Sequence, residues 1–228
     1  MAVNIISPFS DPSLYDRFFL EAFEPDDLAR LEARKAWVAK ETEAHEMQVL
    51  VVERRSLFYT WFLELPMHKD HTARTLRFRK GKRVGDLVQS SPNERLVSED
   101  VKRVIEEVDP NGDGHRFFPV NIVHKNGDAY DGTYYAWTVH RKLDALHPDS
   151  PGLYFVDPSK PATTGLMRKS GFSETRDNLW VKKDVIGDCC AWYDPRGLQI
   201  LYISDRLHEA FRDHKFTGFD VGAEWAEV

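Results

Sequence analysis

The sequence predicts an α+β fold, a mostly antiparallel sheet with a few packed helices. The chain has 228 residues and is 42% hydrophobic, which is enough for a sizeable buried core. Segments rich in β-branched and aromatic residues are separated by Gly, Pro and Asn, as in hairpin-connected strands. The regular alternation of strands and helices that marks a parallel sheet is absent. An aromatic content of 12% excludes the composition of a disordered chain.

The N-terminal part of the chain predicts one helix followed by strands. The segment Asp26 to Glu46 is rich in Ala, Leu, Glu, Lys and Arg, begins with acidic residues and contains neither Gly nor Pro, so we predict a helix. The segments Gln48 to Glu53, Leu57 to Leu65 and Arg74 to Arg79 contain β-branched or aromatic residues and are predicted strands.

The middle of the chain predicts a hairpin. Asn126 and Gly127 lie between the apolar segments Phe118 to His124 and Thr133 to Val139. An Asn-Gly pair tolerates the positive φ of a tight turn. We therefore expect two antiparallel strands joined by a slightly long loop.

The C-terminal part predicts irregular chain and then two strands. The segment Leu143 to Lys169 contains four prolines, which argues against a long helix. Trp180 to Val185 and Leu198 to Ile203 have the composition of strands.

Two similar segments, Leu96 to Glu99 and Tyr202 to Asp205, lie 106 residues apart and contain Ser98 and Ser204. Each runs from an apolar pair through Ser and an acidic residue into helical spacing, so both serines are predicted N-caps. The apolar faces of these helices are Val101, Val104, Ile105 and Val108 in the first and Leu207, Ala210 and Phe211 in the second. Common capping physics explains the likeness, and an internal duplication is the alternative.

The formal net charge is −6, from 37 acidic and 31 basic residues, which disfavours nucleic acid or an anionic membrane as the partner. One basic segment, Arg74 to Arg83, has six Lys or Arg residues in ten. Its alternation with Leu76 and Phe78 indicates a strand with one solvated face. A strand that contacts phosphates is the alternative.

The cysteines and the N-terminus predict a cytoplasmic protein. Cys189 and Cys190 are neighbours in sequence and cannot readily form an unstrained disulfide. The first ten residues contain no Lys or Arg, unlike a secretory signal. No apolar run approaches the roughly 18 residues of a membrane helix.

No motif predicts a catalytic, cofactor or metal site. The segment Asp109 to Gly114 resembles the start of a calcium loop, but Val120 occupies the position of the required bidentate acid. His68 and His71 offer too few ligands for a metal. No flanking motif marks either cysteine as a nucleophile, so both are expected to behave as small buried residues.

Acidic residues gather near two predicted turns, where recognition loops are often found. They are Glu106, Glu107, Asp109, Asp113, Asp128 and Asp131. We expect them to contact a basic partner, and the 6 Trp and 8 Tyr residues offer further interface anchors. For a single acid, capping, turn formation or solvation is the alternative explanation.

Several motifs occur in the order and spacing of a large bacterial immunity-protein family. They are Gly85-Asp86-Leu87, Leu96-Val97-Ser98-Glu99, Phe118-Pro119-Val120, Tyr134-Tyr135, Leu143-Asp144-Ala145, Leu201 to Ala210 and Thr217 to Asp220. The chain resembles that family over roughly residues 85 to 222. We therefore divide it into an N-terminal region, 1–84, and a family core, 85–228, packed as one compact unit.

The resemblance implies a cytoplasmic, non-catalytic inhibitor that binds and neutralises a cognate toxin. Members of the family are encoded beside polymorphic or type VI secreted toxins. An enzyme that reverses or hydrolyses a toxin's product, with Asp128 and Asp131 as acid and base, is one alternative. A nucleic-acid-binding protein built on Arg74 to Arg83 is the other. A cognate toxin is the expected partner, with no membrane and no nucleic acid.

Overall fold

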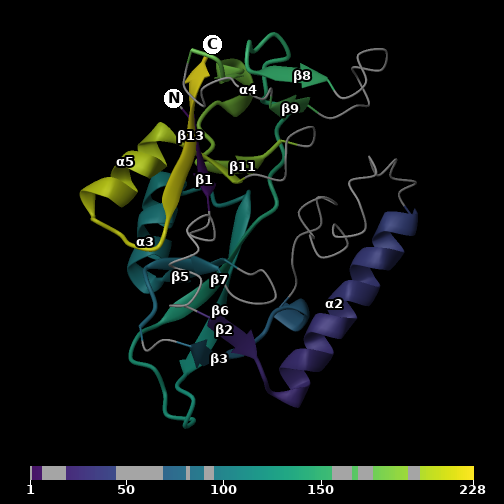
Figure 1. The fold of residues 1–228 in the computed structure, drawn as a ribbon, viewed down its shortest axis with the longest axis vertical. Coiled ribbons are helices and arrows are strands. Elements are labelled where there is room, and N and C mark those ends of the chain that lie inside the picture. The colour runs from purple at the N-terminus through teal and green to yellow at the C-terminus, as the bar shows by residue number, and fades with distance from the viewer. Residues whose placement is uncertain are drawn as a thin grey trace.

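The computed structural model describes residues 2–6, 19–44, 69–80, 83–89, 95–155, 166–168, 177–194 and 201–228 (Figure 1). The predicted strands Gln48 to Glu53 and Leu57 to Leu65 lie outside these residues, as does His68.

The larger sheet has six strands in the order β2-β3-β6-β7-β5-β4. The strands are β2 (Phe19–Ala22), β3 (Thr75–Lys80), β4 (Leu87–Gln89), β5 (Arg95–Ser98), β6 (His115–Val123) and β7 (Tyr134–Val139). Residues on both sides of position 84 contribute to this sheet, so the expected division at residue 84 runs through one continuous sheet.

A second sheet has five strands in the order β10-β13-β1-β12-β11. The strands are β1 (Ala2–Ile6), β10 (Trp180–Val181), β11 (Ala191–Tyr193), β12 (Leu201–Ser204) and β13 (Asp220–Glu227). A small separate sheet pairs β8 (Leu153–Phe155) with β9 (Leu166–Arg168). Within the described residues, only the pairs β3–β6 and β10–β13 are parallel.

The helices are α2 (Pro25–Ala44), α3 (Glu99–Val108), α4 (Lys183–Ile186) and α5 (Asp205–Asp213), with a 3-10 turn η4 (Lys69–His71). The predicted α+β class with a mostly antiparallel sheet is confirmed, as is the long N-terminal helix. The predicted strand from Trp180 to Val185 is wrong beyond Val181, because the chain turns at Lys182 into α4. β8 and β9 interrupt the segment that was predicted to be irregular.

The predicted hairpin is confirmed. β6 and β7 pair antiparallel from His115–Val139 to Val120–Tyr134. Gly127 has a φ of 91° in the connecting loop, a conformation that glycine adopts without steric cost.

The two sheets are copies of one arrangement. The five strands of the smaller sheet correspond, in order, to five neighbouring strands of the larger one: β10 to β3, β13 to β6, β1 to β7, β12 to β5 and β11 to β4. Every neighbouring pair has the same relative direction in both sheets. Even the antiparallel bridge between Leu146 and Val181 matches the pairing of Ala22 with Leu76. The two similar sequence segments are therefore part of a structural repeat.

The two copies exchange one strand. In chain order, β1 comes before β3 to β6, which belong to the six-stranded sheet, and β7 comes before β10 to β13, which belong to the five-stranded sheet. β1 nevertheless lies in the five-stranded sheet and β7 in the six-stranded one. Each copy thus completes its sheet with a strand from the other, and the copies are topologically interlocked.

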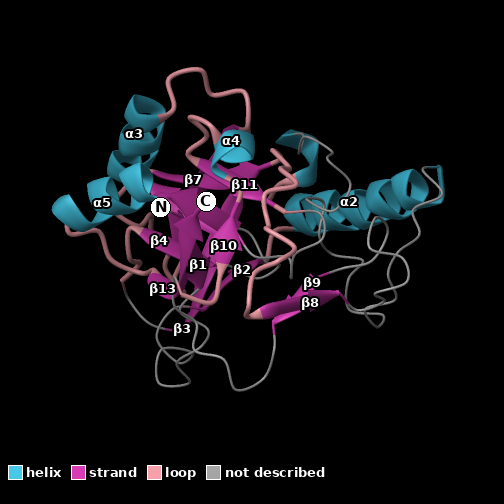
Figure 2. Ribbon diagram, turned by 90° about the horizontal axis from the view of Figure 1, so that it is seen from above, coloured by secondary structure: helices cyan, strands magenta, loops and turns pink. Residues whose placement is uncertain are grey.

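Both predicted N-caps are confirmed. The hydroxyl oxygen of Ser98 accepts a hydrogen bond from the amide of Val101, and that of Ser204 accepts one from Leu207. α3 and α5 lie side by side (Figure 2). Their apolar faces share one core with both sheets, including Ile105 and Phe211, each 0% exposed.

The outer face of each sheet has its own core. The outer core of the first copy contains Leu76, Val88, Leu96 and Val120, and that of the second contains Val181, Trp192, Tyr202 and Trp225 at the corresponding positions. In the second copy, Tyr202 stacks on Trp192 and meets Trp225 edge to face, a favoured aromatic geometry.

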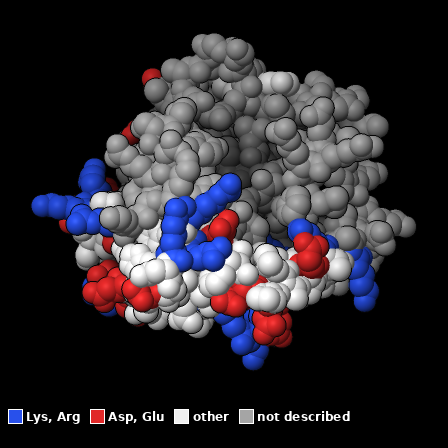
Figure 3. All heavy atoms as spheres, turned by 60° about the horizontal axis from the view of Figure 1, so that its bottom comes forward, with Lys and Arg blue, Asp and Glu red and all other residues white. Residues whose placement is uncertain are grey.

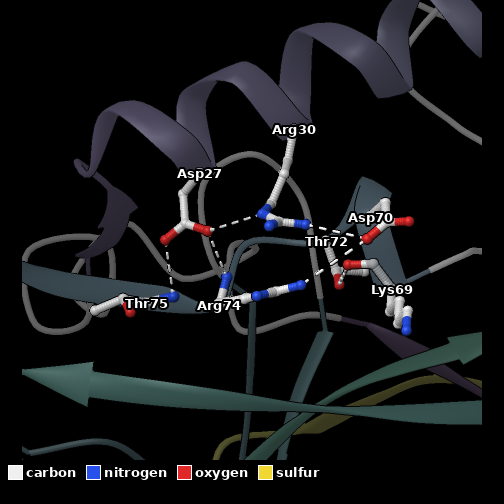
Figure 4. A network of polar contacts seen from close by, with 7 residues as sticks. All are labelled: Asp27, Arg30, Lys69, Asp70, Thr72, Arg74 and Thr75. Atoms are coloured by element: carbon white, nitrogen blue, oxygen red, sulfur yellow. Dashed lines mark hydrogen bonds and ion pairs between the residues drawn. The ribbon is translucent and has the colours of Figure 1, made fainter.

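The buried carboxylate of Asp27 links helix α2 to the start of β3 by hydrogen bonds (Figure 4). Its two oxygens accept hydrogen bonds from the backbone amides of Arg74, at 2.8 Å, and Thr75, at 3.0 Å. The guanidinium of Arg30 lies 3.8 Å from Asp27 and 3.3 Å from Asp70 of η4. These contacts satisfy the buried carboxylate of Asp27, so the residue has a structural role.

Candidate functional site

Five exposed acids lie on α3 and the turn that follows it. They are Glu99, Asp100, Glu106, Glu107 and Asp113. The bases of the same segment are Lys102 and Arg103, which pair with Glu106 at 2.8 Å and Glu107 at 3.4 Å. The side chains of Glu106 and Glu107 remain 50% and 60% exposed in these pairs. We call the exposed side chains of residues 99–113 the α3 surface, and it is acidic overall.

Of the six predicted contact residues, Glu106, Glu107 and Asp113 lie on the α3 surface, and two others lie elsewhere. Asp128 and Asp131 are exposed in the loop between β6 and β7, and the amide of Asn126 donates a hydrogen bond to Asp128 at 2.6 Å. This loop follows β6, whereas Asp113 precedes it. A nine-residue strand spans about 30 Å, so the six predicted acids do not form one surface.

The sixth predicted acid, Asp109, is buried. It is the C-cap residue of α3 and only 6% exposed, so the structure does not present it to a partner. Its carboxylate accepts a hydrogen bond from the guanidinium of Arg141 at 3.0 Å. Burial tends to raise the pKa of Asp109, but hydrogen bonds from Arg141 and Cys190 hold it below its ordinary value.

His115 and Cys190 lie beside Asp109. They are 6% and 0% exposed, and the possible ligand atoms of all three residues lie within 4.8 Å of one another. Burial lowers the pKa of His115 and raises that of Cys190, so that both side chains are neutral at pH 7. We call Asp109, His115 and Cys190, with the attached Arg141, the buried cluster.

The cluster joins distant parts of the fold. Asp109 ends α3, His115 begins β6, Arg141 follows β7 and Cys190 precedes β11. Gly114 permits the approach of Arg141, since a Cβ at this position would lie 2.6 Å from the guanidinium carbon.

Sequence reasoning missed this cluster because its members share no local spacing. The sequence predicts Asp109 as a contact with a basic partner and Cys190 as a small buried residue, and the burial of Cys190 supports the second prediction. The strand exchange and the packing of α3 bring these residues together, and no short motif encodes either feature.

Among the described residues, many of the predicted aromatic anchors are core residues. Trp137, Trp192 and Trp225 are at most 2% exposed. They stabilise the cores of the sheets and are not accessible to a partner.

The basic strand is partly neutralised by acids. Arg74 lies 3.9 Å from Asp70, and Arg77 lies 3.5 Å from Glu21 and covers the ring of Phe23. Leu76 and Phe78 are buried on the other face, as the alternation predicts. Acidic and basic side chains are interspersed over the described part of the face in Figure 3, unlike a continuous phosphate-binding surface.

The comparison with protein families identifies the chain. Among the described residues, no helix is both long and apolar enough to cross a membrane. No curated protein matches the sequence. Residues 27–223 match the Immunity protein family (Imm11), which extends the resemblance over residues 85 to 222 towards the N-terminus. The match covers most of the chain, including the greater part of both copies of the repeat, and the protein therefore belongs to this immunity protein family.

Proposed function

We propose that this protein binds a cognate toxin directly and neutralises it by occlusion. The observation that carries the proposal is the family match over residues 27–223. The toxin is of the polymorphic or type VI secreted kind, and the inhibitor acts without catalysis in the cytoplasm.

The α3 surface is the proposed contact with the toxin. Four of its five acids project from α3, whose Val101 and Ile105 are 0% exposed on the opposite face. A rigid support of this kind lowers the entropy lost on binding. Excess negative charge steers a basic partner towards it.

Asp128 and Asp131 form a second, separate candidate contact. Their loop carries fewer acids than the α3 surface and lies at the other end of β6. Glu106, Glu107 and Asp113 are therefore the main proposed contacts, and Asp109 supports them from the interior.

The two alternatives have less support. Asp128 and Asp131 are both exposed on a loop, and a general acid and base require a shared, partly desolvated site. The basic strand is paired with acids at Glu21 and Asp70.

Protection as a function of dose tests the proposal. The protein is co-expressed at graded levels with the toxin encoded beside its gene, and survival is compared with the amount of each protein. Direct inhibition predicts protection only near a one-to-one ratio and a stable complex of the purified pair. Full protection at a small fraction of the toxin level, without a complex, would support the enzymatic alternative.

A further inference from the structure

The buried cluster lies inside the fold, away from the exposed side chains proposed to contact the toxin. Asp109, His115 and Cys190 come from three separate elements, are all buried, and point ligand atoms to within 4.8 Å of one another. We propose that these three side chains bind a single zinc ion, which ties the end of α3 to the starts of β6 and β11. This inference is independent of toxin binding.

The chemistry of the donors selects zinc. A thiolate sulfur, an imidazole nitrogen and a carboxylate oxygen are the ligands that Zn²⁺ uses, whereas Ca²⁺ and Mg²⁺ require oxygen ligands. Three protein ligands leave one position of a tetrahedral ion for water.

A buried nitrogen without a partner points to a ligand. Nδ1 of His115 has no hydrogen-bond partner within the described part of the chain, although the residue is only 6% exposed. Buried polar atoms of folded proteins are nearly always satisfied. A metal ion bound at this nitrogen would satisfy it.

The other copy of the repeat shows that the fold does not require this donor set. Asp86 is the counterpart of Cys190, because their carbonyls accept the equivalent hydrogen bonds from the amides of Ser98 and Ser204. The carboxylate of Asp86 accepts hydrogen bonds from the amide of Thr217, at 2.9 Å, and from its hydroxyl, at 2.8 Å. Ordinary hydrogen bonds therefore join the loop after α5 to the residue before β4 at that junction, without histidine or cysteine.

Arg141 is compatible with a metal at the cluster. It donates to Oδ2 of Asp109 and so orients the carboxylate, as outer partners of metal ligands commonly do. Coordination replaces the thiol proton of Cys190, which leaves to solvent, by a zinc–sulfur bond. Thiolate and carboxylate together then balance the two charges of the ion, and Arg141 adds one positive charge.

Cobalt provides a direct probe of the site. The purified full-length protein is freed of metal with a chelator and titrated with Co²⁺. We expect a thiolate-to-cobalt charge-transfer band that saturates at one equivalent and disappears when Zn²⁺ is added. Zinc should also raise the melting temperature of the metal-free protein. A chain that gives no such band and no thermal shift would overturn the proposal.

The neighbouring cysteines supply a matched control. Cys190→Ser and His115→Gln should abolish the charge-transfer band or weaken cobalt binding by at least tenfold, whereas Cys189→Ser should retain it. If Cys190→Ser fails to fold, the titration of the parent and of Cys189→Ser still decides the outcome. A band that persists in Cys190→Ser and is lost in Cys189→Ser would place the metal outside the cluster.

Discussion

Gly114 lies so close to Arg141 that a side chain would displace the guanidinium. A Cβ at residue 114 would stand 2.6 Å from Cζ and Nε of Arg141. We expect Gly114→Ala to move Arg141 away from Asp109 and to lower the free energy of unfolding by about 1–3 kcal/mol, as measured by urea denaturation.

A double-mutant cycle isolates that contact. An Arg141→Ala background removes Cζ and Nε of residue 141, the two atoms nearest to the added methyl group, and keeps Cβ at 3.0 Å. The cost of Gly114→Ala should therefore be smaller there. Equal costs in both backgrounds would mean that Gly114 is needed for another reason.

The phenol of Tyr135 gives the fold a dependence on alkaline pH. It donates a hydrogen bond to Glu99 at 2.6 Å, and this bond, together with burial, raises the pKa of Tyr135 to about 12. Because the folded pKa exceeds the unfolded value of about 10, the contribution is complete below pH 10 and is lost as the pH rises towards 12. Denaturation midpoints should fall less steeply over this range in Tyr135→Phe.

An exposed tyrosine controls for the loss of a phenol group. Tyr154 is 44% exposed on β8, and Tyr154→Phe should retain the parent's pH dependence. If Tyr135→Phe and the parent lose stability in parallel above pH 10, the bond to Glu99 does not contribute.

At the scale of elements, the packing of α5 depends on Phe211. The ring is fully buried and meets Phe216 and Phe219 edge to face. We expect Phe211→Ala to lower the free energy of unfolding by about 3–5 kcal/mol. Leu28→Ala, at a residue 48% exposed on α2, is the control and should cost far less. A loss below about 1 kcal/mol for Phe211→Ala would contradict this packing.

Gly218 joins the loop after α5 to β4 of the other copy. Its φ is +90°, and a Cβ would lie 2.0 Å from the carbonyl oxygen of Leu87. Gly127 has nearly the same φ, +91°, with nothing within 4 Å of its Cβ position. Gly127→Ala therefore measures backbone strain alone, about 1–2 kcal/mol. Gly218→Ala should be clearly more destabilising in thermal or chemical denaturation, and equal losses would refute a tight junction.

Local elements were predictable because local physics determines them. The serine caps, the apolar faces of α3 and α5 and the Asn-Gly hairpin all depend on residues within one or two turns of one another. α4 was not predicted, because Trp180 to Val185 has strand-like composition and the turn at Lys182 depends on tertiary contacts. The amide of Lys182, for example, donates a hydrogen bond to the carbonyl of Ala145.

At the scale of the molecule, the repeat was visible in sequence only through its two capped helices. Corresponding core positions differ in residue type, as with Val88 and Trp192, or Leu96 and Tyr202. A core constrains its total volume and apolar character more than the residue at each position. The exchange of β1 and β7 leaves no local signal, so neither the interlocked sheets nor the buried cluster could be predicted.

The exposed acids illustrate the same limit. Sequence proximity to two turns suggested one acidic surface, but the length of β6 separates Asp113 from Asp128 and Asp131.

The separation of the two groups of acids allows a comparison of two matched variants. Glu106→Gln/Asp113→Asn and Asp128→Asn/Asp131→Asn each remove two negative charges from a chain of net charge −6, so both variants have the same overall charge.

Association kinetics of the purified protein with the toxin encoded beside its gene, measured across ionic strength, test the central claim of direct neutralisation through the α3 surface. We predict that association of the parent slows as salt rises. Glu106→Gln/Asp113→Asn should associate several-fold more slowly at low salt, and Asp128→Asn/Asp131→Asn should remain closer to the parent. Association that does not depend on salt, with both double variants binding like the parent, would contradict the account.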